Sequence, residues 1–83
     1  MNWFKKIIFA GLPVFNTREV LRKLRNSGAN FYRSGKGSHE IWIGPNGQKM
    51  AISVGAGGQM INPRTLRKIV QYFGINYNQF LSS

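Results

Sequence analysis

The run Gly37-Ser38-His39, in the middle of the chain, contains the only histidine of the sequence, and imidazole is the side chain best suited to proton transfer at neutral pH. The only carboxylates are Glu19 and Glu40, and cysteine is absent. Two well-separated glutamates are too few to hold the ions of a two-metal nuclease, and the lack of cysteine excludes thiolate chemistry and cysteine-bound zinc. We therefore expect no metal and no cofactor in any chemistry that this chain performs.

RNA cleavage is the chemistry that a histidine among cations can perform without a metal. RNA supplies its own nucleophile, the 2′-hydroxyl, so a protein needs to take that proton, hold the phosphate and offset negative charge in the transition state. His39 is the candidate general base, and Arg33, Lys36 and Lys49 are the candidate phosphate contacts near it. The competing interpretation is that a lone histidine at the start of a strand has only a structural role.

The charge of the chain points to a polyanionic partner. Twelve Lys and Arg against two acidic residues give a formal net charge of +10. Arg64, Arg67 and Lys68 share one face of a predicted helix that contains no acid, whereas an ordinary solvated face mixes both signs. We predict that this face is a wider RNA-docking surface, although an acidic protein or an anionic membrane would satisfy the same charge.

Helix caps, turn residues and the alternation of apolar and polar residues predict the helices and strands that position these residues. Asn16 as a cap and Gly28 as a stop predict a helix over 17–27, and Asn62 with Pro63 predicts a second helix that ends at Gly74. Three strands are predicted between the helices, over 30–34, 38–43 and 48–54. The turn over 44–47 makes the last two a hairpin, and the glycine-rich stretch 55–61 is predicted to be a flexible connection.

This order predicts an α+β domain of α-β-β-β-α type, with a three-stranded antiparallel sheet and both helices on one face. Strict alternation places Ile41 and Ile43 toward the helices, with Glu40 and Trp42 on the opposite face. His39 shares the face of Ile41 and Ile43, but its place at the start of the strand lets it reach solvent.

The domain limits are predicted at residue 13. Residues 1–12 contain no motif and are interpreted as an N-terminal extension, and residues 13–83 as a single RNA-binding or ribonuclease domain. No apolar run approaches the ~20 residues of a membrane span, so we expect a cytoplasmic protein without a membrane partner.

The order of these segments resembles one family. Gly37-Ser38-His39 followed by Ile41-Trp42 is similar to the characteristic strand of HicA toxins, and the helices "REVLRKLRNSG" and "NPRTLRKIVQYFGI" are similar to those that flank it. The resemblance implies a double-stranded-RNA-binding-domain-like fold and a toxin that cleaves mRNA. His39 would be its catalytic residue and Gly37 and Ser38 would lie at the substrate site. It also implies a HicB-like antitoxin that masks the active surface.

Two other functions remain open at this point. A non-catalytic RNA-binding module would need only the basic faces and exposed aromatic residues, for which Tyr32 and Trp42 are candidates. A DNA-binding regulator is less well supported, because the two helices are separated by the whole sheet and cannot form a helix-turn-helix.

Overall fold

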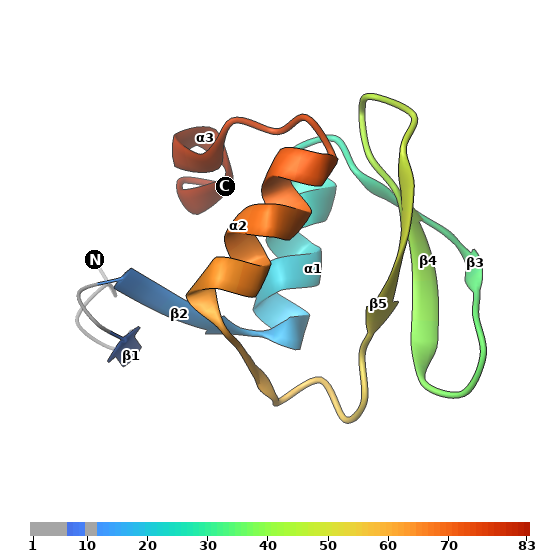
Figure 1. The fold of residues 1–83 in the computed structure, drawn as a ribbon, viewed down its shortest axis with the longest axis horizontal. Helices are drawn as coiled ribbons and strands as arrows, with labels where there is room; N and C mark the ends of the chain where they lie inside the picture. The colour runs from blue at the N-terminus through green and yellow to red at the C-terminus, as the bar shows by residue number, and fades with distance from the viewer. Residues whose placement is uncertain (1–6, 10–11) are drawn as a thin grey trace.

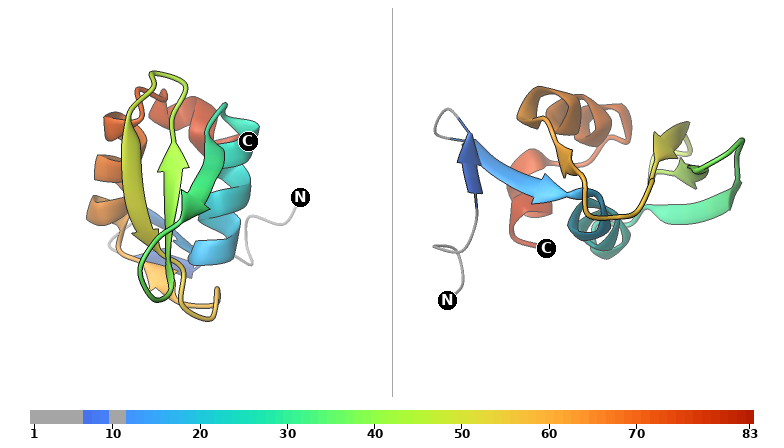
Figure 2. Two further views of the ribbon diagram at one scale, coloured as in Figure 1. Left: turned by 90° about the vertical axis from the view of Figure 1, so that its right-hand side faces the viewer. Right: turned by 90° about the horizontal axis from the view of Figure 1, so that it is seen from below.

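A three-stranded antiparallel sheet forms one layer of the molecule, and two helices cover one of its faces (Figure 1). The computed structural model describes residues 7–9 and 12–83. The strands are β3 (Asn30–Ser34), β4 (His39–Ile43) and β5 (Lys49–Ser53), with β4 in the centre, as Figure 2 shows. The helices are α1 (Thr17–Asn26) and α2 (Pro63–Tyr72). The predicted α-β-β-β-α order and its helix-covered sheet are therefore confirmed.

An asparagine side chain caps the start of each of the three helices in the described part of the chain. The Oδ1 of Asn16 accepts the Glu19 N–H of α1 at 2.8 Å, and the Oδ1 of Asn62 accepts the Arg64 N–H of α2 at 2.8 Å. Asn76 caps the short helix α3 (Tyr77–Leu81) in the same way. These side chains satisfy N–H groups that the first turn of a helix cannot pair internally, and for this reason the two predicted helix starts are found where the sequence places them.

The core lies between the sheet and the two long helices, and α3 closes it at one end. Its largest fully buried side chains are Trp42 from the sheet, Phe73, Phe80, Leu24, Leu66, Val20 and Val70. Phe80 meets the ring of Phe15 edge-on, with 6.5 Å between the ring centres. The buried apolar residues of the two long helices recur at the 3.6-residue spacing of a helix and form one face that packs into this core.

The predicted orientation of β4 is wrong. Trp42 is 1% exposed and belongs to the core, whereas Ile41 and Ile43 are only half-buried on the face turned away from the helices. Glu40 lies on the same side as Trp42, and its Oε1 accepts the indole N–H at 2.9 Å. The polar handle of the tryptophan is therefore satisfied inside the fold, and Trp42 is not available to stack on a base.

A second, smaller antiparallel sheet joins the start of the described chain to the segment before α2. It consists of β1 (Ile7–Phe9), β2 (Leu12–Asn16) and β6 (Met60–Ile61), with β2 in the centre. The predicted limit between residues 12 and 13 thus falls inside β2. The rest of the predicted extension, residues 1–6 and 10–11, lies outside the described residues.

The glycine-rich stretch is not the plain linker that the sequence predicts. Its last residues form β6, and two of its carbonyls bond to the start of α1. The Thr17 N–H donates to the Gln59 carbonyl at 2.9 Å, and the Arg18 N–H donates to the Gly57 carbonyl at 3.0 Å. Together with Asn16, this loop satisfies the first N–H groups of α1, so that helix end is not a free anion-binding site.

We expect Gly44→Ala to destabilise the fold by about 1–3 kcal/mol, because overpacking forces the surrounding backbone to move. A Cβ on Gly44 would lie 2.6 Å from Cδ1 and 2.7 Å from Cβ of Phe73, which is itself fully buried. The phenylalanine Cβ is attached to the backbone directly after α2 and cannot swing away. Urea denaturation of the purified chain measures the change.

Gly58→Ala is the matched control for this prediction. A Cβ there meets no atom within 4 Å, and the backbone of Gly58 is not in the left-handed region. Its free energy of unfolding should stay within about 0.5 kcal/mol of the wild type or rise slightly. Equal unfolding midpoints for the two variants would show that α2 does not pack on Gly44 as described.

Candidate functional site

His39 begins β4 directly after the tight turn that joins it to β3. The carbonyl of Lys36 lies 3.0 Å from both the His39 backbone N–H and the ring Nδ1. A carbonyl oxygen only accepts, so this contact is a hydrogen bond when Nδ1 carries the proton. In the neutral imidazole Nε2 then has the lone pair, and the side chain is exposed to solvent. The turn therefore presents a proton acceptor outward.

Two glycines shape this turn. Gly37 has φ +59°, a left-handed conformation that residues with a Cβ rarely adopt, and its position is open to solvent. Gly35 leaves room for the histidine, since a Cβ there would lie 3.2 Å from the Cβ of His39. Ser38 is exposed, and its carbonyl accepts the Val54 N–H at 2.9 Å. The predicted positions Gly37 and Ser38 thus build the turn that orients His39.

The structure brings two of the three predicted phosphate contacts to the histidine end of the sheet. Lys36 is exposed in the turn itself, and Arg33 pairs with Ile41, the next residue of β4 on the face of His39. Lys49 instead pairs with Ile43 at the far end of β4, about 13 Å from His39 at a rise of ~3.3 Å per residue. Its Nζ lies 4.3 Å from the ring centre of Tyr32.

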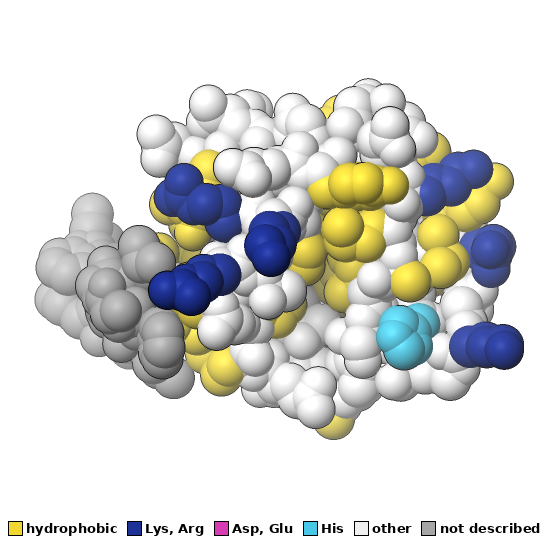
Figure 3. All heavy atoms as spheres, in the orientation of Figure 1, with side chains coloured by type: hydrophobic (Ala, Val, Ile, Leu, Met, Phe, Trp, Pro, Cys, Tyr) yellow, Lys and Arg dark blue, Asp and Glu magenta, His cyan; other side chains and the backbone are white. Residues whose placement is uncertain are grey.

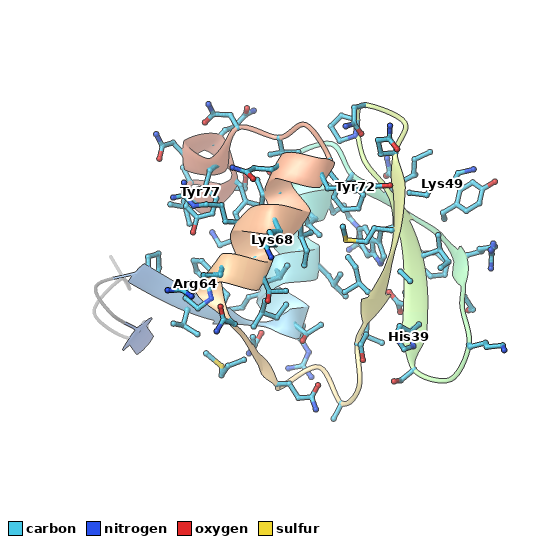
Figure 4. All side chains as sticks on the ribbon, in the orientation of Figure 1. His39, Lys49, Arg64, Lys68, Tyr72 and Tyr77 are labelled. Carbon is cyan, nitrogen blue, oxygen red and sulfur yellow. The ribbon has the colours of Figure 1, made fainter. Side chains whose placement is uncertain are left out.

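The basic residues of α2 lie on its exposed side. Figure 4 shows Arg64 and Lys68 on the side of α2 that faces the viewer, and His39 is visible in the same view near the lower end of the sheet. Arg67 is also exposed, but its guanidinium stacks over the ring of Tyr77 at 4.4 Å. Arg64 and Lys68 therefore share a side of the molecule with the histidine. The space-filling view of this side shows basic side chains over α2 and the histidine at the sheet (Figure 3).

Negative charge is nearly absent around these groups. Of the two carboxylates, Glu40 is turned to the helix side of the sheet and is bonded to Trp42, and Glu19 belongs to α1. Within residues 12–83, no carboxylate pairs with Arg33, Lys36, Arg64 or Lys68. The cations of this side of the molecule keep their charge for an external anion.

Residues 7–9 and 12–83 contain no group of three histidine or acidic side chains that could hold a metal ion. The same part of the chain has no helix long and apolar enough to cross a membrane.

One functional contact was not predicted from the sequence, namely the carbonyl of Lys36 that positions the imidazole. The sequence feature that could have indicated this contact is the four-residue stretch from Lys36 to His39 with a glycine at its second position. Such a stretch is typical of a tight turn, in which the fourth residue bonds to the carbonyl of the first. Every residue has a backbone carbonyl, so residue types alone do not reveal that the carbonyl of Lys36 bonds to the histidine.

Fold and site together define a small, basic α+β domain of the double-stranded-RNA-binding type, with a histidine presented at the end of its sheet. A family model described as the HicA toxin of bacterial toxin–antitoxin systems matches residues 17–75, well over half of the chain. The chain belongs to this family, and it is the toxin component of a toxin–antitoxin system. Family membership also implies a cognate antitoxin. No curated protein matches the chain.

Proposed function

We propose that the chain is an endoribonuclease that cleaves mRNA without a metal ion, with His39 as general base. The observation that supports this most directly is the bond between Nδ1 of His39 and the Lys36 carbonyl, which favours the tautomer with a free Nε2 pointing to solvent. His39 is exposed, so a substrate can reach this nitrogen.

In the proposed reaction Nε2 of His39 takes the proton of a 2′-hydroxyl. The 2′-oxygen attacks the adjacent phosphorus, the bond from phosphorus to the 5′-oxygen breaks, and the departing oxygen takes a proton from the imidazolium or from water. Lys36 and Arg33 offset the added negative charge on the phosphoryl oxygens. Gly37 and Ser38 hold the turn, and Arg64, Arg67, Lys68 and Lys49 supply contacts to more distant phosphates.

The products of RNA cleavage test this mechanism. Attack by the 2′-oxygen leaves a 2′,3′-cyclic phosphate on one side of each cut and a 5′-hydroxyl on the other, so we expect these ends at every cut and an unchanged rate in EDTA. The measurement is mass spectrometry of fragments from a single-stranded RNA incubated with the purified chain. Fragments with 3′-hydroxyl and 5′-phosphate ends, or loss of cleavage in EDTA, would refute the proposed chemistry and indicate attack by a metal-bound water.

Lys68→Ala should weaken RNA binding and reduce its dependence on salt. Each phosphate contact to a single strand contributes about 0.7 to the slope of log K against log salt concentration, so one lost contact should lower the slope by that amount. Arg22→Ala removes the same charge from an exposed position of α1 and is the control. Fluorescence anisotropy with labelled RNA at several salt concentrations measures both. An equal change of slope in both variants would show that the α2 face makes no contact of its own.

The proposal includes the partner. A HicB-like antitoxin would hold the toxin inactive by covering the histidine and the cations around it. The positive charge that binds RNA is available to an acidic protein surface in the same way.

A further inference from the structure

A groove of about 340 Å³ lies between β5 and α2, on the side of the molecule that carries Arg64 and Lys68. It is lined by Met50, Ala51, Ile52, Ser53, Ile61, Thr65, Lys68 and Ile69. Apolar side chains dominate this list. Near its Met50 end, the Tyr72 hydroxyl donates to Oε1 of Gln48 at 3.3 Å and ties α2 to the β4–β5 hairpin. Its Ser53 end lies toward His39, the partner of Ser53 in the sheet.

One wall of this groove is an open sheet edge. In the sheet of β3, β4 and β5, the strand β5 pairs with β4 alone, and its other side has no partner strand among the described residues. The bonds from Gly44 N–H to Gln48 and from Val54 N–H to Ser38 show which residues of β5 exchange bonds with β4. By the antiparallel alternation these are Met50 and Ile52, so the N–H and C=O groups of Lys49, Ala51 and Ser53 point outward.

Such an edge selects for a polypeptide. Donors and acceptors that alternate at strand spacing match the backbone of another extended chain, and an apolar groove beside them receives every second side chain. An RNA strand fits this edge less well, because its donors, the 2′-hydroxyls and base N–H groups, do not alternate with acceptors at the spacing of a β-strand. Proteins normally protect an open edge with charge, prolines or a covering element, and here the exposed Ala51 and Ser53 provide none of these.

The charge at the rim determines which polypeptide fits. Lys68 lines the groove and Arg64 lies one turn away on α2, whereas the Nζ of Lys49 lies over Tyr32 on the other face of the sheet. Neither Arg64 nor Lys68 pairs with a carboxylate among residues 12–83. We propose that an extended, acidic segment of a protein partner docks here as a fourth strand beside β5, with apolar side chains in the groove and carboxylates toward these cations.

This docking would act on the histidine. Strands in a sheet are about 4.8 Å apart, so the added strand would lie on the order of 10 Å from β4, beside the pair His39–Ser53. A bound acidic segment would also neutralise Arg64 and Lys68, which the proposed function assigns to RNA. Inhibition of cleavage by the segment therefore rests on the proposed function, whereas the docking itself does not.

The first test uses a blocked eight-residue peptide that alternates valine with glutamate, titrated into the full chain labelled with ¹⁵N. We expect the amide signals of Lys49, Ala51, Ser53 and Lys68 to shift together with one dissociation constant. The same peptide N-methylated at alternate backbone nitrogens, on its bonding edge, should bind at least tenfold more weakly, because it can no longer donate to β5. A lysine version of the peptide should not bind.

Variants of the edge complete the test. Ala51→Pro removes the N–H of residue 51, which points outward and does not bond to β4. A proline is tolerated at such a position of an edge strand. We expect it to weaken peptide binding at least tenfold, whereas Ala51→Val keeps the N–H and the affinity. The N-methylated peptide makes the same test on the unaltered protein if Ala51→Pro does not fold.

Three results would overturn the proposal: equal binding of the N-methylated peptide, peptide-induced shifts that lie away from β5 and α2, or shifts at these amides with single-stranded RNA but not with the peptide. The last would assign the groove to RNA. A separate cleavage assay keeps the two proposals apart, since peptide binding can succeed in a chain that cleaves nothing, and cleavage can succeed in a chain that ignores the peptide.

Discussion

Replacing His39 with alanine should lower the rate of RNA cleavage by a factor on the order of 10²–10⁴, the usual contribution of a general base. The side chain is exposed and its ring bonds to the Lys36 carbonyl at the surface, so its loss removes no core contact. The unfolding midpoint should therefore stay close to that of the wild type. The measurements are initial rates on a single-stranded RNA, and growth together with total mRNA after induction in cells.

Lys36→Ala is the matched variant for this prediction. It removes a cation beside the histidine and keeps the backbone carbonyl that orients the ring, so we expect a smaller loss of rate than in His39→Ala. If His39→Ala folds and cleaves at the wild-type rate, the histidine is not the base. If both the wild type and His39→Ala are folded and neither cleaves RNA, a basic RNA-binding module becomes the better account of this chain.

Trp42→Ala should destabilise the domain by about 3–5 kcal/mol, enough to unfold a large fraction of a chain of this size. Trp42 is 1% exposed, meets Phe31 edge-on at 6.4 Å and bonds to Glu40, which would be left without this donor. Urea denaturation followed by circular dichroism measures the loss.

Tyr32→Ala is the control for Trp42, since Tyr32 is an aromatic residue of the same sheet that is 50% exposed. We expect a change in the free energy of unfolding of less than about 1 kcal/mol, because the ring loses mainly its contact with Lys49. A stable Trp42→Ala chain with weakened RNA binding would restore the interpretation of Trp42 as an exposed stacking residue, and the buried position described above would be wrong.

The burial of Trp42 and the exposure of Tyr32 show that the sequence alone does not identify which face of the sheet meets the helices. Residues 41–43 are all apolar, so alternation there does not identify the face that meets the helices. The larger tryptophan ring fills the core, and Glu40 on the same face is tolerated because it bonds to the indole N–H. Neither effect is visible from residue types along one strand.

Local signals were sufficient elsewhere. Asn16 and Asn62 are found as helix caps because a cap acts within three residues of itself, and the turn over 44–47 closes the predicted hairpin. The small sheet was not predicted, since β6 has two residues and its partner β2 lies far away in the sequence. The groove beside β5 depends on how α2 lies against the sheet, which is a tertiary property.

The contacts of α1 also bear on how the protein is made. Its first N–H groups bond to carbonyls of Gly57 and Gln59, and the Nζ of its buried Lys23 donates to the carbonyl of Leu81 at 2.8 Å and to that of Ser83 at 3.0 Å. Helix α1 is thus completed by residues that are synthesised much later than the helix itself. A growing chain already carries the histidine turn before residues 57–83 are made, so we expect the scaffold that supports this turn to form only after their synthesis.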